Sequence, residues 1–100
     1  MIRFQRSIRT ARGRGLEATK WAKKVTEYIN GKRPETSVQV FSTRFGDIGT
    51  IVWQVDVDDL AALDKFQQGL NADEGYWNLL KKSYDLFAEG SVHDTVFESA

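Results

Sequence analysis

The stretch FSTRFGDIGTIVWQVDVDD, residues 41–59, constrains the fold more than any other part of the chain. Polar and apolar residues alternate on both sides of its centre, which is typical of β-strands. Gly46 and Gly49 permit the positive φ angles that a tight hairpin turn requires. The sequence therefore predicts two antiparallel strands, at residues 37–45 and 50–57.

Both faces of this predicted hairpin carry apolar side chains. Pairing Phe45 with Thr50 gives one face that suits packing beneath helices, with Val38, Val40, Ile51, Trp53, Val55 and Val57. The opposite face is mixed and holds Gln39, Phe41, Thr43, Phe45, Thr50, Val52, Gln54 and Asp56. A small domain needs only one apolar face on such a sheet, so the second face indicates a further layer, either another subunit or a ligand.

The rest of the chain predicts one more strand at each end and two helices. Before the hairpin we expect a strand at 2–10 and a helix from about Leu16 to Asn30, stopped by Gly31. After the hairpin we expect a helix that begins after Asp58 or Asp59, is interrupted at 69–72, restarts at Asp73 and closes at Gly90. The last expected element is a strand at 91–98. This β-α-β-β-α-β order predicts an α+β, ferredoxin-like fold with a four-stranded antiparallel sheet in the order 4-1-3-2 and both helices on one face. No linker or repeat divides the chain, so residues 1–100 are expected to form one domain.

Two charged residues interrupt the helix-facing side of the first and last strands. Alternation places Arg6 on that side of the first strand and Asp94 on that side of the neighbouring last strand. A charge left there without a partner would be costly. We therefore expect Arg6 and Asp94 to lie on one face and to pair.

The mixed face of the sheet predicts a homodimer. Two such faces closing on each other would make a barrel with an interior of mixed polarity. Burial of one large apolar side chain is worth about 1.5–3 kcal/mol, whereas association costs about 4–15 kcal/mol. Several aromatic residues on each subunit, counted twice, can therefore meet that cost.

The run from FSTRFGDIGTIVWQVDVDDLAALDKF to LNADEGYWNLLKK resembles the dimeric α+β barrel superfamily, and within it the NIPSNAP-like and antibiotic-biosynthesis-monooxygenase-like domains. The features that carry the resemblance are the Phe45-Gly46 turn, Trp53, Leu60, Phe66 and the restart from Asp73 to Trp77. The resemblance implies a dimeric barrel of ferredoxin-like subunits. It does not fix a function, because the superfamily holds cofactor-free oxygenases, isomerases, haem enzymes and proteins without a known activity.

The candidate ligand-binding residues all lie on the mixed face of the predicted sheet. They are Phe41, Thr43, Val52, Gln54, His93 and Thr95. The two residues considered for a catalytic role are His93, as a general base near neutral pH, and Gln54. A structural role is nevertheless the more frequent one for a lone His in a strand, and for Gln54 and Thr43 hydrogen bonding along the barrel seam is the simpler role.

Two functions follow from these residues and the resemblance. The first is a barrel of uncharacterised function that binds a small apolar or aromatic ligand between the sheets. The alternative is a cofactor-independent monooxygenase-like or isomerase-like enzyme acting on an aromatic or polyketide-like substrate. Tyr76, Trp77, Tyr84 and Phe87 recur at helical spacing, and we interpret them as core or dimer contacts.

The sequence predicts no metal and no cofactor. There is no Cys and only one His, which excludes a disulfide and a thiolate metal site and leaves little for zinc. The aspartates at 56, 58, 59 and 64 lack the spacing of an EF-hand loop.

An RNA-binding module is a third alternative, because Arg residues are frequent near the N-terminus and RNA-recognition motifs share the β-α-β-β-α-β order. Residues 1–50 carry 11 Lys and Arg against 4 acids, and residues 51–100 carry 3 against 10. However, the total charge is zero, and the expected third strand, TIVWQVDV, lacks the aromatic-rich basic motif of those modules. We therefore expect no nucleic-acid partner.

A cytoplasmic protein without a membrane partner is expected. The N-terminal run MIRFQRSIRTARGRG contains no signal-peptide apolar region. No stretch of the sequence approaches the ~18 apolar residues of a membrane span. The absence of Cys is in keeping with a reducing compartment.

Overall fold

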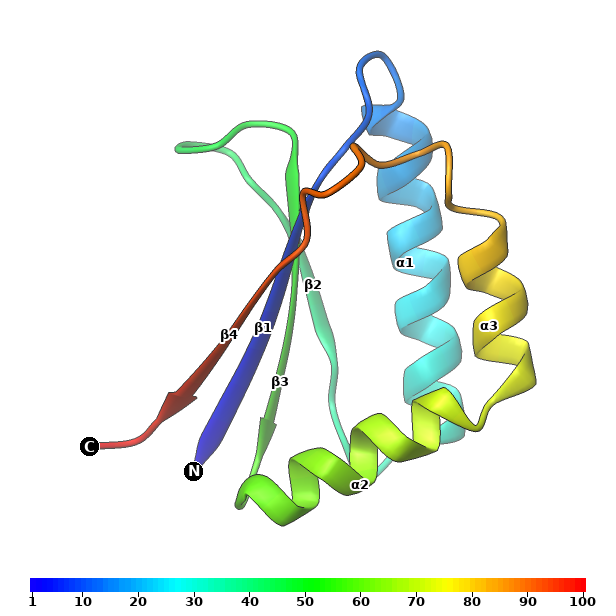
Figure 1. The fold of residues 1–100 in the computed structure, drawn as a ribbon. Helices are drawn as coiled ribbons and strands as arrows, with labels where there is room; N and C mark the ends of the chain where they lie inside the picture. Colours follow the sequence, from blue (N-terminus) through cyan, green and yellow to red (C-terminus); the bar gives the residue numbers. More distant parts are fainter.

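Four strands form one antiparallel sheet, and three helices lie on one side of it (Figure 1). The computed structural model describes residues 1–100. Its elements are β1 (Ile2–Arg9), α1 (Gly15–Lys32), β2 (Gln39–Ser42), β3 (Thr50–Val57), α2 (Leu60–Asn71), α3 (Glu74–Lys81) and β4 (His93–Glu98). The strand order is β2-β3-β1-β4. These findings confirm the predicted α+β, ferredoxin-like fold, its 4-1-3-2 sheet and the break in the second helix.

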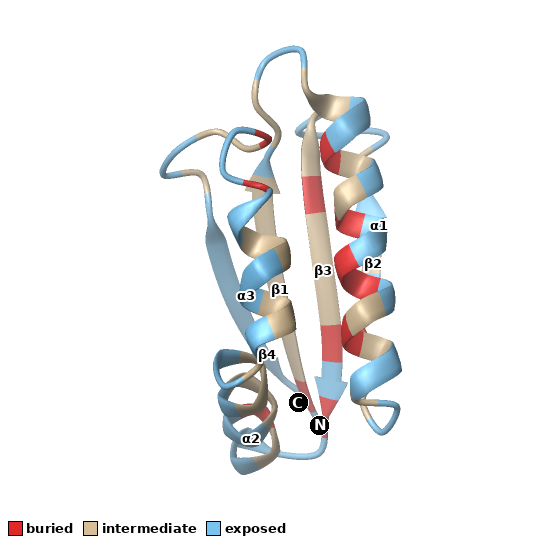
Figure 2. Ribbon diagram, turned by 90° about the vertical axis from the view of Figure 1, so that its right-hand side faces the viewer, coloured by how far each residue is buried: buried red, intermediate tan, exposed pale blue.

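The core lies between the sheet and α1. Buried residues recur along α1 every three or four positions, so they form one stripe that faces the two central strands (Figure 2). One buried cluster comprises Ile2, Val25, Ile29, Val38, Val55, Val57 and Leu63, and a second comprises Ala18, Ala22, Ile51 and Leu86. The predicted helix-facing side of the hairpin is thus confirmed. None of the helices combines the length and apolar character needed to cross a membrane.

The hairpin differs from the prediction in its register. Phe41 pairs with Val52, which is a shift of two residues from the pairing of Phe45 with Thr50, and β2 ends at Ser42. A shift of two leaves every side chain on its predicted face, because strand side chains alternate with a period of two. The longer loop has a physical reason: Gly46 and Gly49 both have positive φ, of 95° and 94°, so each end of the loop turns separately.

The helix ends also differ from the prediction. α1 continues through Gly31 to Lys32 and ends where the Arg33 N–H donates to the carbonyl of Ile29, at 2.9 Å. α2 runs through the expected interruption as far as Asn71. α3 ends at Lys81, well before Gly90, because the chain forms a turn there. In this turn the Ser83 hydroxyl donates a hydrogen bond to the Leu80 carbonyl at 2.7 Å.

Asp73 anchors the start of α3 to α1. Its carboxylate accepts a hydrogen bond from the Tyr76 backbone N–H at 3.1 Å, which caps α3. It also accepts from the Tyr28 hydroxyl of α1 at 2.7 Å and pairs with Arg33 at 3.2 Å. The Tyr28 hydrogen bond is the main reason that the pKa of Asp73 lies below its usual value. This cluster ties the start of α3 to α1.

Substitution of Gly75 by Ala is expected to break this cluster. A Cβ atom at Gly75 would lie 2.1 Å from the Tyr28 hydroxyl oxygen, so Tyr28 must leave Asp73. Loss of a hydrogen bond to a charged group costs about 2 kcal/mol, which urea unfolding would measure. Gly31→Ala is the matched control, because Gly31 is also helical and has no atom within 4 Å of the added Cβ. It should stabilise the protein slightly, and an equal loss in both variants would contradict the account.

Candidate functional site

A cavity of about 590 Å³ lies between the sheet and the helices. Its floor is formed by β1 and β3, its walls by α1 and α3, and its rim by residues 83–92, which lead from α3 towards β4. Of the 21 residues that line it, 16 are hydrophobic. A cavity of this size, apolar with few polar groups, is typical of small-molecule sites.

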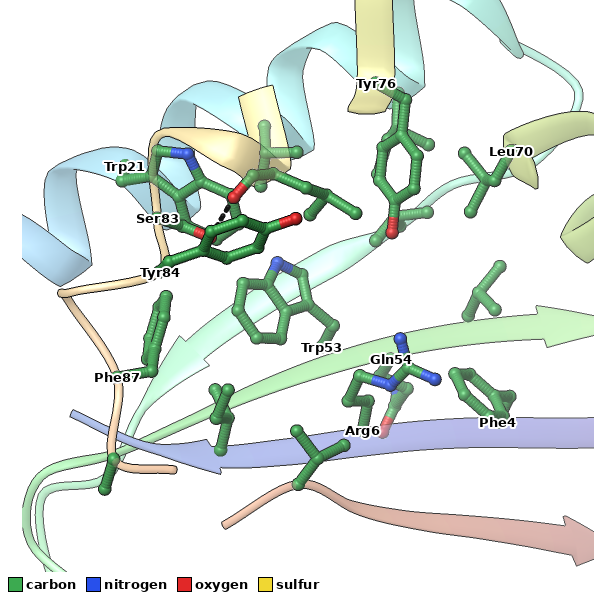
Figure 3. Close-up of a pocket in the computed structure, with 18 of the residues that line it drawn as sticks. Phe4, Arg6, Trp21, Trp53, Gln54, Leu70, Tyr76, Ser83, Tyr84 and Phe87 are labelled. Atoms are coloured by element: carbon green, nitrogen blue, oxygen red, sulfur yellow. Dashed lines mark hydrogen bonds between the residues drawn. The ribbon is translucent and has the colours of Figure 1, made fainter. Parts of the chain in front are cut away.

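Aromatic side chains gather at one end of the cavity (Figure 3). Trp21, Trp53 and Phe87 contact one another edge to face, with ring centroids 5.5–6.4 Å apart. The Trp21 indole N–H donates to the Leu79 carbonyl at 2.9 Å, and the Trp53 indole N–H donates to the Thr26 hydroxyl at 3.0 Å. Both indole donors are therefore already used within the chain. The rings are held in fixed orientations and offer the cavity apolar surface.

The opposite end of the cavity carries Arg6 from β1 and Tyr76 from α3 (Figure 3). Arg6 pairs with Asp94 on β4 through two hydrogen bonds, from Nε at 2.7 Å and from Nη2 at 2.8 Å. The prediction that these two residues share a face and pair is confirmed. The hydrogen bond from Arg6 is the main reason that the pKa of Asp94 lies below its usual value.

Tyr76 is partly buried, and burial raises the pKa of its hydroxyl above the usual value. The positive charge of Arg6 acts in the opposite direction but is the smaller effect. Tyr76 is therefore a neutral hydroxyl at physiological pH, able to donate a hydrogen bond. Tyr84 and Glu89 add polar groups at the rim, and Tyr84 is 73% exposed.

The residues predicted from sequence as ligand-binding lie on the other face of the sheet. Strand pairing places Phe41, Val52 and His93 in one row across that face, with Ser7 between the last two. Gln54 and Thr95 lie in the next row, on either side of Gln5. Thr43 follows β2 at the edge of this face. Figure 1 shows no helix on this side of the sheet, which we call the outer face.

Two of the four polar residues in this set, Thr43 and Gln54, already have side-chain hydrogen bonds within the chain. The side-chain oxygen Oε1 of Gln54 accepts a hydrogen bond from the side-chain amide of Gln5 at 2.7 Å, and Nε2 of Gln54 donates to the side-chain oxygen of Gln39 at 3.5 Å. The Thr43 hydroxyl donates to the Thr50 carbonyl at 2.9 Å. Of the six predicted residues only Gln54 also lines the cavity, and its side chain is hydrogen-bonded to Gln5 and Gln39 on the outer face. The structure thus brings the six together as a surface, not as a pocket.

The cavity residues were not predicted as a site. Tyr76, Tyr84 and Phe87 were interpreted as core or dimer contacts because of their helical spacing, and the structure places all three around the cavity. Arg6 was expected only to pair with Asp94. A charged residue on the apolar side of a central strand was the one available signal, because such a residue is rarely kept without a role.

No three His, Cys, Asp or Glu side chains come together in a way that could hold a metal ion. Of the four aspartates weighed in the sequence, Asp56 pairs with Arg3 at 2.9 Å on the outer face. Asp59 caps α2 by accepting a hydrogen bond from the Ala62 N–H at 2.8 Å. These two carboxylates therefore have structural partners.

No protein-family model matches the sequence, and no curated protein matches it significantly. Solved structures match closely. An uncharacterised NIPSNAP domain protein from Burkholderia xenovorans superposes with a TM-score of 0.83 at 15% identity, over 100% of this chain and 95% of that one. An antibiotic biosynthesis monooxygenase gives 0.74 at 15% identity, over 100% and 99%.

A third match is SnoaB, a cofactor-independent oxygenase from Streptomyces nogalater, with a TM-score of 0.68 at 13% identity, over 98% of this chain and 91% of that one. Likeness at these identities concerns the fold. The chain shares the ferredoxin-like α+β fold of these proteins, which is the fold that the sequence resemblance implied.

Proposed function

We propose that this protein binds a small apolar or aromatic molecule in the cavity between the sheet and the helices. The observation that carries the proposal is the 590 Å³ cavity itself, with its wall of fixed aromatic rings. An apolar molecule that leaves water for this cavity gains about 25 cal/mol for each Å² of apolar surface buried. The aromatic edges add favourable contacts to an aromatic ligand.

Binding of tetralin, an apolar bicyclic probe, tests this proposal by calorimetry. Leu80 lines the cavity from α3, and the substitution Leu80→Trp would fill part of the space. We expect this variant to lose about tenfold or more in affinity, which is the effect of replacing an apolar contact by a clash. Lys81→Trp is the control, because Lys81 is the exposed next residue and does not line the cavity. No binding to the unmodified protein, or equal binding to both variants, would contradict the proposal.

A homodimer is the second part of the proposal, with the outer faces of two sheets in contact. Only 13 of the 100 residues are buried in one protomer, which leaves much apolar surface to be covered. Phe41 and Phe97 are 48% and 49% exposed on the outer face. The superfamily fold supports the same arrangement.

Ligand binding between the two sheets, by the six residues predicted from sequence, stays a prediction for the assembled dimer, and a structure of that dimer would test it.

Cofactor-independent oxygenation is a second candidate function, favoured by the likeness in fold to SnoaB and by a hydroxyl and a guanidinium at one end of an aromatic cavity. In such a reaction O₂ supplies one oxygen atom to the substrate, and the other leaves as water with two substrate hydrogens. Oxygen uptake with an electron-rich phenol of two or three fused rings would test it. Uptake that is no faster than without protein would contradict this function and leave the binding proposal intact.

A cytoplasmic location and the lack of a nucleic-acid partner complete the proposal. Arg3 and Arg14 are paired with acidic residues, so they are less available to phosphates. The net charge of zero provides no long-range attraction for a polyanion. A filter-binding titration with single-stranded RNA should show no affinity that depends on salt, and such affinity would contradict this part.

A further inference from the structure

We infer that the polar end of the cavity receives a neutral oxygen acceptor, a ketone or quinone carbonyl carried by the apolar ligand, through hydrogen bonds from Arg6 and Tyr76. This inference rests on the proposed function and specifies the ligand of the same cavity. Three features carry it: a free donor on Arg6, a free hydroxyl on Tyr76, and the balance of charge around them.

Arg6 is fixed in place and still has a donor to offer. Its Nε and Nη2 atoms bind the two carboxylate oxygens of Asp94 in a fork, which holds the guanidinium in one plane. Its Nη1 atom makes no hydrogen bond within the chain. Arg6 lines the cavity (Figure 3), so this remaining nitrogen is available to a molecule that enters.

Tyr76 offers a second donor. Figure 3 shows its hydroxyl directed from α3 toward the sheet, at the end of the cavity where Arg6 lies. The hydroxyl has no hydrogen-bond partner within the chain, because the bond between Tyr76 and the Asp73 side chain comes from the backbone N–H of Tyr76. The only side-chain nitrogen or oxygen atom that is both fully buried and without a partner is Arg14 Nε. The Tyr76 hydroxyl and Arg6 Nη1 also have no partner, so neither atom is fully buried, and both can be reached by solvent or a ligand. Two donors without a partner in the chain thus lie at the same end of a largely apolar cavity, where the Arg6 side chain is also 43% exposed.

The charges around the cavity favour a neutral acceptor over a carboxylate. Arg6 is the only basic residue in the lining, and Asp94 already balances its charge. Glu89 adds a negative charge at the rim. A carboxylate would lose its hydration without meeting a net positive charge, whereas a carbonyl oxygen needs only the donors.

Three probes with one bicyclic skeleton test the inference by calorimetry: 1-tetralone, tetralin and tetralin-1-carboxylate. We expect 1-tetralone to bind about tenfold more tightly than tetralin, because its carbonyl gains a hydrogen bond from a charged donor. The carboxylate should bind more weakly than the ketone. Equal affinity for ketone and hydrocarbon, or tightest binding of the carboxylate, would overturn the inference while the binding proposal stands.

Matched variants identify the donors. Arg6→Gln should remove the preference for the ketone, measured as the ratio of the affinities of that same variant for 1-tetralone and for tetralin. Arg3→Gln is its control, because Arg3 lies on the same strand in a similar two-bond pair, with Asp56, but on the outer face. Tyr76→Phe should reduce the preference, whereas Tyr28→Phe, whose hydroxyl is bonded to Asp73, should not.

These outcomes separate the two proposals. If none of the probes binds the unmodified protein, the proposed function fails and the inference fails with it. If all bind but the preference survives in both Arg6→Gln and Tyr76→Phe, only the inference fails. Because Tyr76→Phe removes a single oxygen atom, it keeps the test decisive if Arg6→Gln does not fold.

Discussion

Replacement of Val52 by Asp is expected to turn the proposed homodimer into a monomer. Val52 lies on the central strand β3, between Phe41 and Ser7, in the middle of the outer face. A carboxylate there would be buried in the proposed dimer without a partner, which costs free energy of association. Because the dimer is two-fold symmetric, each subunit would contribute this cost once. The dimer dissociation constant should rise at least about a hundredfold, which corresponds to about 3 kcal/mol.

Sedimentation velocity over a range of concentrations measures this change. Leu16→Asp provides the control, because Leu16 is a 71% exposed aliphatic residue at the start of α1, on the helix side of the sheet. An acidic residue is favourable near a helix N-terminus, so this control should stay folded and dimeric. An unmodified protein that sediments as a monomer at micromolar concentration would contradict the dimer.

Replacement of Trp53 by Ala is expected to cost about 3–5 kcal/mol of unfolding free energy, as for other large aromatic residues in a core. Trp53 contacts Trp21 and Phe87, packs against both core clusters, and donates to Thr26. The variant should also lose affinity for tetralin, because the central ring of the cavity wall is gone. Urea unfolding measures the first effect and calorimetry the second.

Trp77→Ala is the matched control for this substitution. Trp77 is 41% exposed on α3, donates to the Asn71 carbonyl at 2.8 Å, and does not line the cavity. It should cost about 1 kcal/mol, the usual value for one hydrogen bond, and should leave tetralin binding unchanged. Equal losses of stability in the two variants would mean that the aromatic cluster is not central to the core.

The arrangement of side chains on the sheet could be predicted from the sequence, because it depends only on alternation along each strand. Arg6 and Asp94 illustrate this, since alternation and the order of the strands were enough to place them opposite each other. The hairpin register was less well determined. Two glycines separated by two residues allow loops of different length, and a shift of two residues leaves the faces unchanged.

The end of α3 depends on contacts that sequence spacing does not reveal. The aromatic residues after Lys81 continue the helical period, but the helix ends at Lys81, and Leu86 is buried against the first half of α1. The backbone N–H of Ala11 donates to the Leu86 carbonyl at 2.8 Å, and Thr10 pairs with Phe87. These long-range bonds hold the segment in place as the rim of the cavity.

The cavity itself could not be predicted, because alternation identifies which side chains face the helices but not whether they fill the space beneath them. The gap depends on where α3 lies relative to α1, and that position is set by Asp73 with Tyr28 and Arg33. The sequence therefore directed attention to the outer face, where polar and apolar residues visibly mix. The helix side of the sheet was interpreted as a filled core, but it contains the 590 Å³ cavity.

The most direct test of the cavity as the ligand site is a ¹⁹F NMR titration of protein labelled with 5-fluorotryptophan. The three Trp residues give three resonances, and only Trp21 and Trp53 line the cavity. Addition of tetralin should shift the resonances of Trp21 and Trp53 and leave that of Trp77 unchanged. A shift confined to Trp77, or equal shifts at all three positions, would contradict the account.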